Sequence, residues 1–576
     1  MTRVLAAGYR PPLADIAFTL AHIVPVAELR ALEPFEHADP ATVASVLDEA
    51  GRFAAEVVAP TNRTGDVEGA TLTADGVRCP VAVREAYRRY VEAGWGALTQ
   101  PVDHGGGGFP LTVGVAAREL LTAANLALSM APTLAGGVAQ VLASHGSAGQ
   151  RERYLPRLVT GEWLGTMAIT EPQAGSDLGP IATRAVPDGA GYRLTGQKIF
   201  ISYGDHDLTE QIVHLVLART PDAPPGTRGL SLFLVPKWTA DGRRNDVRAV
   251  GLERKLGIRA APTCTMVFGA AGAGAEAEIV GAPHTGLRQM FTMMNDARLG
   301  VAVQGLGVAE RAFQQAVTFA RQRQQGRFAG APAVLTAHPD VRRMLLTMKA
   351  SIEAMRAMCY LTGYAIDLAA HHPVAAARAA AAARADLLTP IVKAWCTDTA
   401  VELTSLAIQV HGGMGFVEET GVAQYYRDVR VTPIYEGTNG IQALDLVGRK
   451  LGADGGLAVQ ALFAEIDQTV RQLPARLARL GAALSAAAAT LTRSTARVSP
   501  AGATPYLRGF GLVLGGWLLA RGAAGAAATA DGDPVARGRL LTADFYAGQL
   551  LPQAHAHFAA AVDPGAVPTE VWDRWQ

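Results

Sequence analysis

The chain has 576 residues, 49% of them hydrophobic, with 52 Lys and Arg against 51 Asp and Glu. This apolar content excludes a disordered chain, and the length suits three or four structural units. A formal net charge of +1 leaves no overall attraction to nucleic acid or acidic membranes, so we expect neither as a partner.

The cysteines and the apolar runs bear on the compartment of the protein. The four cysteines stand far apart without a Cys-x-x-Cys pair, and no His spacing suits a metal, so we expect neither disulfides nor a metal site. A Pro-Pro pair at positions 11–12 interrupts the segment where a signal peptide needs an apolar run. The longest apolar stretch, residues 509–520, is too short to cross a bilayer. We therefore expect a cytoplasmic protein without stable membrane insertion.

Helical patterns dominate the first part of the chain. Residues 1–37 are interpreted as an N-terminal extension and residues 38–160 as a helical domain. Apolar residues recur there every three or four positions, which indicates helices with one buried face. The glycine-rich run 104–110 predicts a loop between two of these helices.

Residues 161–283 change character and predict a β domain. The runs 191–202, 211–219 and 229–236 are β-rich and are separated by Gly, Pro and Asp turns. Because no helices alternate with these strands, we expect an antiparallel sheet.

Helical patterns return in residues 284–452. Long helices are predicted over 286–323, 341–369 and 387–413, with a short helix after Asn439. The Ala-rich stretch 371–386 is interpreted as a helix start or a solvated connector, and we expect it to be mobile. Residues 453–576 predict two or three more helices. The fold class is therefore α+β, mostly α, with an extra helical segment at the C-terminus.

Four motifs carry the chemical signal. They are Ile-Thr-Glu-Pro-Gln-Ala-Gly-Ser-Asp at 169–177, the run 191–202, Val-His-Gly-Gly-Met-Gly-Phe at 410–416 and Pro-Ile-Tyr-Glu-Gly-Thr-Asn-Gly-Ile-Gln at 433–442. The first motif alone reads as a polar turn, and its backbone amides also suit a ring edge or a phosphate. In this order and spacing, the four together resemble the acyl-CoA dehydrogenase family of flavoproteins over residues 40–450.

The segments around 170–179, 200–208 and 293–307, with the C-terminal extension, are similar to the longer members typified by 3-methylmercaptopropionyl-CoA dehydrogenase. The resemblance implies the family fold: an N-terminal helical domain, a middle β domain and a C-terminal helical bundle. It also implies FAD as cofactor and an acyl-CoA thioester as substrate.

The resemblance assigns the catalytic base to Glu436. In the family this carboxylate removes the α-proton of the thioester, and the β-hydrogen leaves as hydride to the flavin, giving a trans-2-enoyl-CoA. A carboxylate near its ordinary pKa of about 4.3 is too weak for this step, so a pocket with little water has to raise its basicity. The alternative interpretation of Glu436 alone is a solvated acid in a turn before Gly437.

The family pattern also assigns cofactor and substrate positions. Those expected to bind FAD are Met167, Ile169, Thr170, Gly175, Ser176, Phe200, Ile201, Ser202, Arg323, Gln409, Val410, His411, Gly412, Gly413, Thr438 and Asn439. Of these, Arg323 and residues 409–413 match positions that reach the cofactor across a subunit interface, so we expect a homodimer or a homotetramer. Those expected to bind the substrate are Ser176, Asn295, Arg298 and Gly437. Asn295 stands where many relatives carry an acidic residue.

Several alternatives stay open at this stage. The family implies electron-transfer flavoprotein as the electron acceptor, but the same fold serves acyl-CoA oxidases. The acyl group is open between 3-methylmercaptopropionyl and other short or medium chains. Some extended relatives bind nucleic acid without dehydrogenase activity, and the near-neutral C-terminal segment argues against that function here. The extension itself suits subunit or intrachain packing better than a lipid surface.

Overall fold

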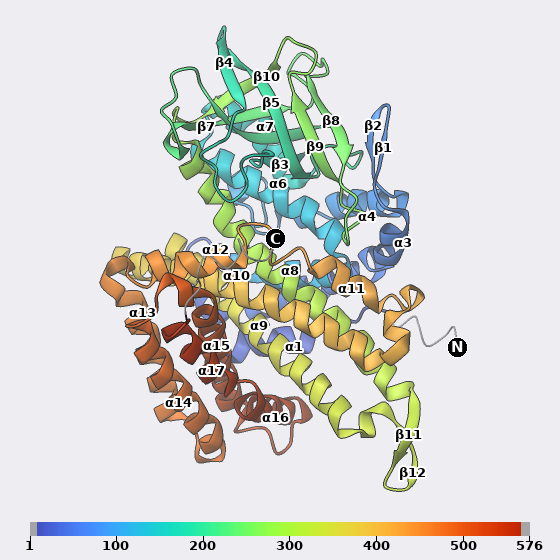
Figure 1. The fold of residues 1–576 in the computed structure, drawn as a ribbon, viewed down its shortest axis with the longest axis vertical. Coiled ribbons are helices and arrows are strands. Elements are labelled where there is room, and N and C mark those ends of the chain that lie inside the picture. Colours follow the sequence, from blue (N-terminus) through green and yellow to red (C-terminus); the bar gives the residue numbers. More distant parts are fainter. Residues whose placement is uncertain (1–7, 566–576) are drawn as a thin grey trace.

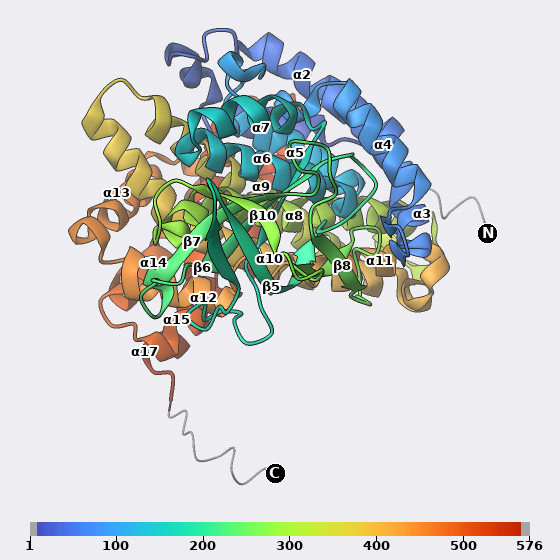
Figure 2. The same ribbon diagram turned by 90° about the horizontal axis from the view of Figure 1, so that it is seen from above.

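A computed structural model describes residues 8–565, apart from the side chain of Asn295. The β domain lies over one end of a bundle of long helices, and the C-terminal helices pack on the opposite part of that bundle (Figures 1 and 2). The predicted order of helical, β and helical parts is confirmed.

Local signals explain several helix starts in the N-terminal part. Asp39 accepts hydrogen bonds from the backbone of Ala41 and Thr42 and so caps the next helix. Ser147 and Gln150 form a reciprocal capping box at the start of another. The helices are α1 (Leu13–His22), α2 (Pro40–Phe53), α3 (Pro60–Glu68), α4 (Val81–Glu92), α5 (Leu111–Ala124), α6 (Leu126–His145) and α7 (Ala148–Thr160), with a small hairpin of β1 (Thr71–Thr73) and β2 (Gly76–Arg78).

The β domain is mixed rather than purely antiparallel, which corrects the prediction. Strand β3 pairs in parallel with β6, from Leu164 opposite Ile212 to Ala168 opposite Val216. Strand periodicity does not encode direction, and here the chain places two other strands between these partners, which allows a parallel pairing. The remaining order is β10-β7-β6-β4-β5-β9-β8, and β10 also pairs with β5. The strands are β3 (Leu164–Ala168), β4 (Arg184–Asp188), β5 (Gly191–Ser202), β6 (Ile212–Arg219), β7 (Leu230–Pro236), β8 (Val247–Leu252), β9 (Thr263–Phe268) and β10 (Ala275–Val280).

Three long helices form the bundle beneath the β domain. The Ala-rich stretch is the start of the third of these helices, so the helix-start interpretation holds and the connector interpretation is wrong. The sequence analysis missed a hairpin and a short helix, because both are brief and lack a clear period. The elements are α8 (Gly286–Gln322), β11 (Gln324–Phe328), β12 (Ala331–Val334), α9 (Pro339–His371), α10 (Ala375–His411), α11 (Val422–Val429) and α12 (Asn439–Asp445).

The described part of the C-terminal extension contains five α-helices, where two or three were predicted. Pro474 and Pro552 end predicted runs that otherwise look continuous, because proline cannot donate the next helical hydrogen bond. Helix α15 lies at the centre of the extension and packs against α9, α10 and α12. The helices are α13 (Leu457–Gln472), α14 (Ala478–Thr495), α15 (Ala503–Ala526), α16 (Pro534–Gln549) and α17 (Gln553–Val562).

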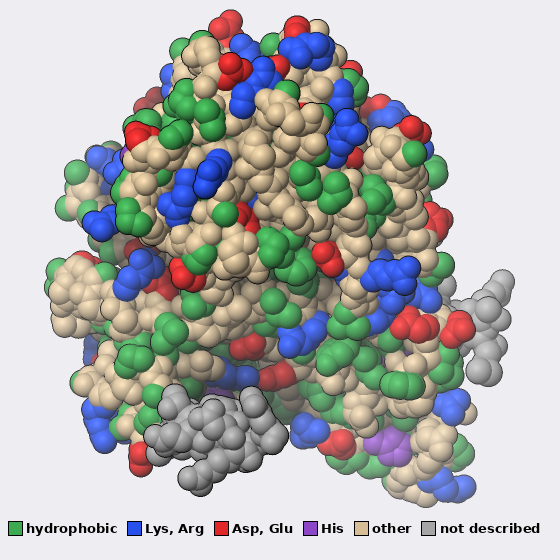
Figure 3. Space-filling model, turned by 45° about the horizontal axis from the view of Figure 1, so that its top comes forward, with side chains coloured by type: hydrophobic (Ala, Val, Ile, Leu, Met, Phe, Trp, Pro, Cys, Tyr) green, Lys and Arg blue, Asp and Glu red, His purple; other side chains and the backbone are tan. Residues whose placement is uncertain are grey.

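Two described helices, α6 and α15, are long and apolar enough by composition to cross a membrane. The apolar run at 509–520 lies inside α15, and the whole helix, unlike that run alone, is long enough for a span. Both helices are largely covered by other parts of the fold, as core helices are. The face of the molecule in Figure 3 shows Lys and Arg interspersed with Asp and Glu.

A buried ionic network joins the two terminal extensions to the bundle. Arg356 on α9 is fully buried and donates to Glu119 on α5 at 2.6 Å and to Glu310 on α8 at 2.9 Å. Asp15 on α1 pairs with Lys349 and with Arg539 on α16. The extensions are therefore fixed to the helices that position the site.

Candidate active site

Glu436 lies in the turn between α11 and α12, where the backbone is left-handed. Its φ is +55°, and that of Gly437 is +77°. A non-glycine residue in this conformation costs about 1–3 kcal/mol and is common at functional sites. The Oε2 atom of Glu436 is buried and has no hydrogen-bond partner among the described residues. A carboxylate oxygen is thus left free inside the protein.

The surroundings of Glu436 raise its pKa. Burial raises the pKa of this carboxyl, and the positive charges of Arg298 and Lys393 partly oppose that effect. The net direction is upward, which makes the carboxylate a stronger base than a solvated glutamate. This is the environment that the chemistry requires of a base for a weakly acidic carbon.

Helix α10 and helix α12 hold the turn in place. The Lys393 ammonium donates to the Gly437 carbonyl at 2.9 Å and to Asn439 Oδ1 at 2.8 Å. Gln442 Nε2 donates to the carbonyls of Glu436 and Gly437 at 3.2 Å each. Thr438 caps α12 by accepting from the backbone of Ile441.

The side chain of Asn439 is bonded within the protein. Its amide donates to Ala394 O, Thr397 Oγ1 and Asp398 Oδ1 on α10, and its oxygen accepts from Lys393. These bonds use the full capacity of the side chain. Asn439 therefore anchors the turn to α10, and its side chain is not free to bind a cofactor.

Arg298 lies beside the turn on α8 and is buried. Its guanidinium lies 5.9 Å from the Phe291 ring centroid, and its Nε has no described hydrogen-bond partner. Burial lowers the pKa of Arg298, while Asp445 and Glu436 raise it. The side chain of Asn295, one turn earlier, lies outside the described part of the structure. Arg298 is thus a donor with spare capacity close to the base.

The β domain supplies a second wall, built on a buried ion pair. Lys198 on β5 is fully buried and donates to Glu171 at 2.8 Å and to the Ile169 carbonyl at 2.9 Å. The Ile199 N–H donates to the Thr170 carbonyl at 2.9 Å. These bonds fix the segment from Ile169 to Glu171 against β5 and leave the Thr170 side chain half-buried.

Phe200 stands out on this wall. It adopts a φ of +59° where β5 slips in register against β9, and its side chain is 59% exposed. A bulge of this kind re-aims a side chain out of the sheet. An exposed aromatic ring held in a strained conformation is a suitable platform for a flat ligand.

The other predicted residues of this wall divide by exposure. Ile169 and Ile201 have buried side chains in the hydrophobic core. Met167 and Ser202 are half-buried, and Gly175 and Ser176 are exposed in the loop after Thr170.

The base and the β wall meet through α11. Asp428, near the end of α11 and eight residues before Glu436, accepts from the backbone of Ile258 at 2.5 Å. Ile258 lies in the loop between β8 and β9, and Tyr203 at the end of β5 donates its N–H to Pro262 in the same loop. The two walls are therefore connected by direct hydrogen bonds.

The last predicted group lies elsewhere. Arg323, Gln409, Gly412 and Gly413 are exposed at the far ends of α8 and α10. Val410 and His411 are buried, and His411 Nδ1 donates to Ala407 O at 2.7 Å while its ring stacks on Phe319 with the centroids 4.4 Å apart. Eighteen residues of α10 separate Lys393 from His411, about 27 Å of helix. A single chain does not bring this group to Glu436.

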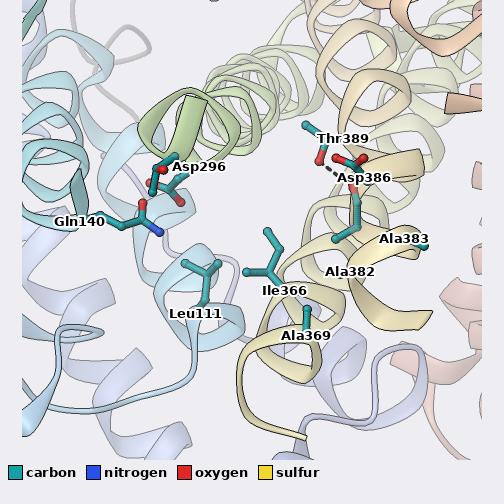
Figure 4. Close-up of a pocket in the computed structure, with 11 residues that line it drawn as sticks. Leu111, Gln140, Asp296, Ile366, Ala369, Ala382, Ala383, Asp386 and Thr389 are labelled. Atoms are coloured by element: carbon teal, nitrogen blue, oxygen red, sulfur yellow. Dashed lines mark hydrogen bonds between the residues drawn. The ribbon is translucent and has the colours of Figure 1, made fainter. Parts of the chain in front are cut away.

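A cavity lies among the helices, and Glu436 is not among the residues that line it. It measures about 460 Å³ between the N-terminal half of α8 and the helices α5, α6, α9 and α10 (Figure 4). Asp386 in its wall pairs with Lys450 and interacts electrostatically with Arg298. Glu436, and not this cavity, marks the reacting centre, because proton abstraction requires a basic side chain. The cavity is lined by Leu111, Gln140, Thr292, Asp296, Ile366, Ala369, Ala382, Ala383, Ala385, Asp386 and Thr389.

The residues present fit FAD. Phe200 offers an exposed ring face, Thr170 and Ser202 offer hydroxyls beside it, and an added Cβ at Gly175, Gly412 or Gly413 would meet open space. No group of three or more metal-ligating side chains occurs among the described residues. The arrangement suits an organic cofactor on the β wall and proton abstraction by Glu436.

The sequence analysis missed the two lysines that organise the site. Lys198 and Lys393 are both fully buried, one in a strand and one in an apolar helical run. A single charged residue inside such a run is the signal that could have identified them, because an unpaired buried charge is strongly disfavoured.

Comparisons with known proteins agree along the whole chain. Family models of the acyl-CoA dehydrogenase N-terminal, middle and C-terminal domains match residues 41–162, 166–271 and 284–451, and an "Acetyl-CoA dehydrogenase C-terminal like" model matches residues 457–570.

Two curated relatives are similar over almost the full length. A 3-methylmercaptopropionyl-CoA dehydrogenase of Ruegeria pomeroyi is 44% identical, covering 97% of this chain and 98% of that protein. The broad-specificity linear acyl-CoA dehydrogenase FadE5 of Mycobacterium tuberculosis is 33% identical, covering 94% and 96%.

Solved structures share the fold. Caenorhabditis elegans ACDH-11 in complex with C11-CoA has a TM-score of 0.79 at 23% identity, covering 94% of this chain and 92% of that one. An acyl-CoA dehydrogenase of Bacillus anthracis complexed with FAD has a TM-score of 0.75 at 19% identity, covering 92% and 90%. Both neighbours contain the extra C-terminal region in their aligned length, and the predicted fold is confirmed.

Proposed function

Because this chain belongs to the acyl-CoA dehydrogenase family and is an oxidoreductase acting on acyl-CoA thioesters, we propose that it converts 3-methylmercaptopropionyl-CoA to the trans-2-enoyl-CoA with FAD as cofactor. The observation that carries the reaction is the free Oε2 atom of Glu436 in its strained turn. The full-length similarity to the Ruegeria pomeroyi enzyme supports the substrate.

In this function Glu436 takes the proton from the α-carbon of the thioester. Its raised pKa increases its affinity for that proton, and its unpartnered oxygen needs no bond to break first. The Glu436 N–H makes no backbone hydrogen bond among the described residues and can donate to the thioester oxygen, where negative charge develops. Arg298 and Lys393 contribute positive charge nearby.

Phe200, Thr170 and Ser202 would hold the flavin ring against β5. When bound, FAD accepts the β-hydrogen of the acyl group as hydride. The buried pair of Lys198 and Glu171 keeps this wall rigid, which preserves the alignment of substrate and ring.

Assembly as a homodimer or homotetramer is part of the proposal. Arg323 and residues 409–413 lie at the far ends of α8 and α10, and His411 is about 27 Å along α10 from Lys393, so this group suits a cofactor of a second subunit rather than its own. We also propose electron-transfer flavoprotein as the acceptor and the cytoplasm as the location. The four described cysteines are all free, which suits a reducing compartment.

Steady-state kinetics with an artificial electron acceptor test the substrate. The purified protein is given 3-methylmercaptopropionyl-, butyryl-, isobutyryl- and octanoyl-CoA, and kcat/KM is compared. The proposal predicts the highest kcat/KM for the thioether substrate. A clear preference for octanoyl- or isobutyryl-CoA would reject this substrate and keep the dehydrogenase activity. Stoichiometric hydrogen peroxide without the acceptor would instead identify an oxidase.

A further inference from the structure

Lys393 is a buried charged residue that bonds directly to the catalytic turn. It lies in the middle of α10, and none of its side chain is exposed. Removing an ammonium group from water is costly, so a fully buried lysine without a direct carboxylate salt bridge requires an explanation. Among the described residues, its hydrogen-bond acceptors are the Gly437 carbonyl at 2.9 Å and Asn439 Oδ1 at 2.8 Å. Both belong to the turn that carries Glu436.

We propose that Lys393 is a positioning residue for proton abstraction, which fixes the left-handed turn at Glu436 and Gly437 and keeps a positive charge beside the base. The turn has two consecutive residues with positive φ, and one of them is not glycine. Such a conformation persists only where surrounding bonds over-determine it. The bonds from Lys393 to Gly437 and Asn439, together with those from Gln442 to the carbonyls of Glu436 and Gly437, supply that restraint.

The contacts around Lys393 give it no other role. Asn439 is itself held by Ala394, Thr397 and Asp398, within five residues of Lys393 on the same helix. The lysine and its neighbours on α10 therefore hold Gly437 and Asn439, which follow the base, from one rigid element. Lys393 does not contact the Glu436 carboxylate by any described hydrogen bond, so it acts through the backbone and through its charge.

The charged groups around Glu436 and Lys393 come from three elements. Arg298 on α8 and Lys393 on α10 both lower the pKa of Glu436, against the larger effect of burial. Burial lowers the pKa of Lys393 to about 7, while Glu436 and Asp398 raise it and Arg298 lowers it. Removing the lysine charge therefore moves the pKa of Glu436 further upward, and the base is ionised only at higher pH.

The test is the pH dependence of anaerobic flavin reduction in the FAD-loaded enzyme at saturating acyl-CoA. Lys393→Met is expected to slow reduction at pH 7 by roughly tenfold to a hundredfold, as small misplacements of catalytic groups do. The acid limb of its pH–rate profile, where the rate falls as Glu436 becomes protonated, is expected to move to higher pH by about one unit. Lys393→Arg keeps the positive charge, so its acid limb is expected to lie at the wild-type pH. Its rate of flavin reduction is expected to recover only in part. KM for the acyl-CoA is expected to change less than kcat.

Lys255→Met is the matched control. Lys255 also donates to a backbone carbonyl, that of Ala261 at 2.7 Å, and burial lowers its pKa to about 8. It makes no contact with the turn, so its variant is expected to keep the wild-type rate and limb. A folded, FAD-loaded Lys393→Met enzyme with the wild-type rate and limb would overturn the proposal.

If Lys393→Met does not fold, Asn439→Ala tests the positioning role instead. This variant keeps the lysine charge but removes one acceptor and the link to α10. Its reduction rate is expected to fall while the acid limb stays in place. An unchanged rate would overturn the positioning role of the clamp.

Discussion

Lys198 and Glu171 form an ion pair, with the N–O distance at 2.8 Å, that is almost wholly removed from solvent inside the β domain. Glu171 also accepts from Thr183 and from the backbone of Ala182. Although burial raises its pKa, Lys198 and these donors bring the pKa of Glu171 below its ordinary value. Burial in turn lowers the pKa of Lys198 to about 8. The pair joins the segment that carries Thr170 to the strand that carries Phe200.

Lys198→Met is expected to destabilise the protein by about 3–5 kcal/mol, because it leaves Glu171 buried without its counter-charge. Chemical denaturation with fluorescence detection measures this. The double variant Lys198→Met/Glu171→Gln is the matched control and is expected to recover part of the loss. Equal stability of the single variant and the wild type would contradict the structural role of the pair.

Phe200→Gly separates stability from cofactor binding. Glycine relieves the left-handed strain but removes the exposed ring, so the free energy of unfolding of the apoprotein is expected to stay within about 1 kcal/mol of wild type. The Kd for FAD is expected to rise up to roughly tenfold, the value of one aromatic stacking contact. Fluorescence titration of the apoprotein with FAD measures the affinity. Val186→Ala, at an exposed apolar residue of β4, is the control, and equal FAD affinity in Phe200→Gly would argue against the platform.

The raised pKa of Glu436 sets the acid limb of the reaction. The base works only when deprotonated, so the rate falls as pH falls through a pKa above the ordinary value of about 4.3. Arg298→Gln removes a charge that lowers this pKa, so the limb is expected to move to higher pH. Stopped-flow flavin reduction from pH 5 to 9 measures it. Arg288→Gln, at an exposed position of the same helix, is expected to leave the limb unchanged, and a shift in both variants would point to a general surface effect.

Arg539→Met tests how the C-terminal extension is attached. Arg539 is buried on α16 and pairs with Asp15 and, at 2.6 Å, with Glu353 on α9. Its loss leaves carboxylates short of a partner in the interior, and a destabilisation of about 3 kcal/mol is expected. Arg476→Met, which breaks an exposed pair with Asp531, is expected to change stability by less than about 0.5 kcal/mol. Urea denaturation compares them, and similar values for both would mean that the network does not fix the extension.

Much of this architecture could be predicted from sequence because periodicity and short motifs encode local structure. The strand 191–202 and the helix from Gly286 match their predicted limits, since β-branched runs and apolar spacing mark both. The pairing of β3 with β6 could not be predicted, because strand direction depends on the whole sheet. Pro474 and Pro552 mark helix ends that the apolar spacing alone does not show.

The candidate site also has a part that could be predicted from the sequence and a part that could not. Glu436, Thr170 and Phe200 lie in recognisable motifs, and their positions follow from the family pattern. The buried side chains of Ile169 and Ile201, the anchoring role of Asn439 and the supports from Lys198 and Lys393 depend on contacts between distant segments. A motif identifies which residues recur, whereas burial and partners decide what each side chain can touch.

The central claim is that Glu436 is the base of an acyl-CoA dehydrogenase, and anaerobic flavin bleaching tests it most directly. The FAD-loaded protein and its Glu436→Gln variant are mixed with 3-methylmercaptopropionyl-CoA without oxygen, and the flavin absorbance is followed. We predict rapid bleaching of the wild type and a rate at least about a hundredfold lower in a variant with the same FAD content. Bleaching of both proteins at the same rate would contradict the assignment of Glu436.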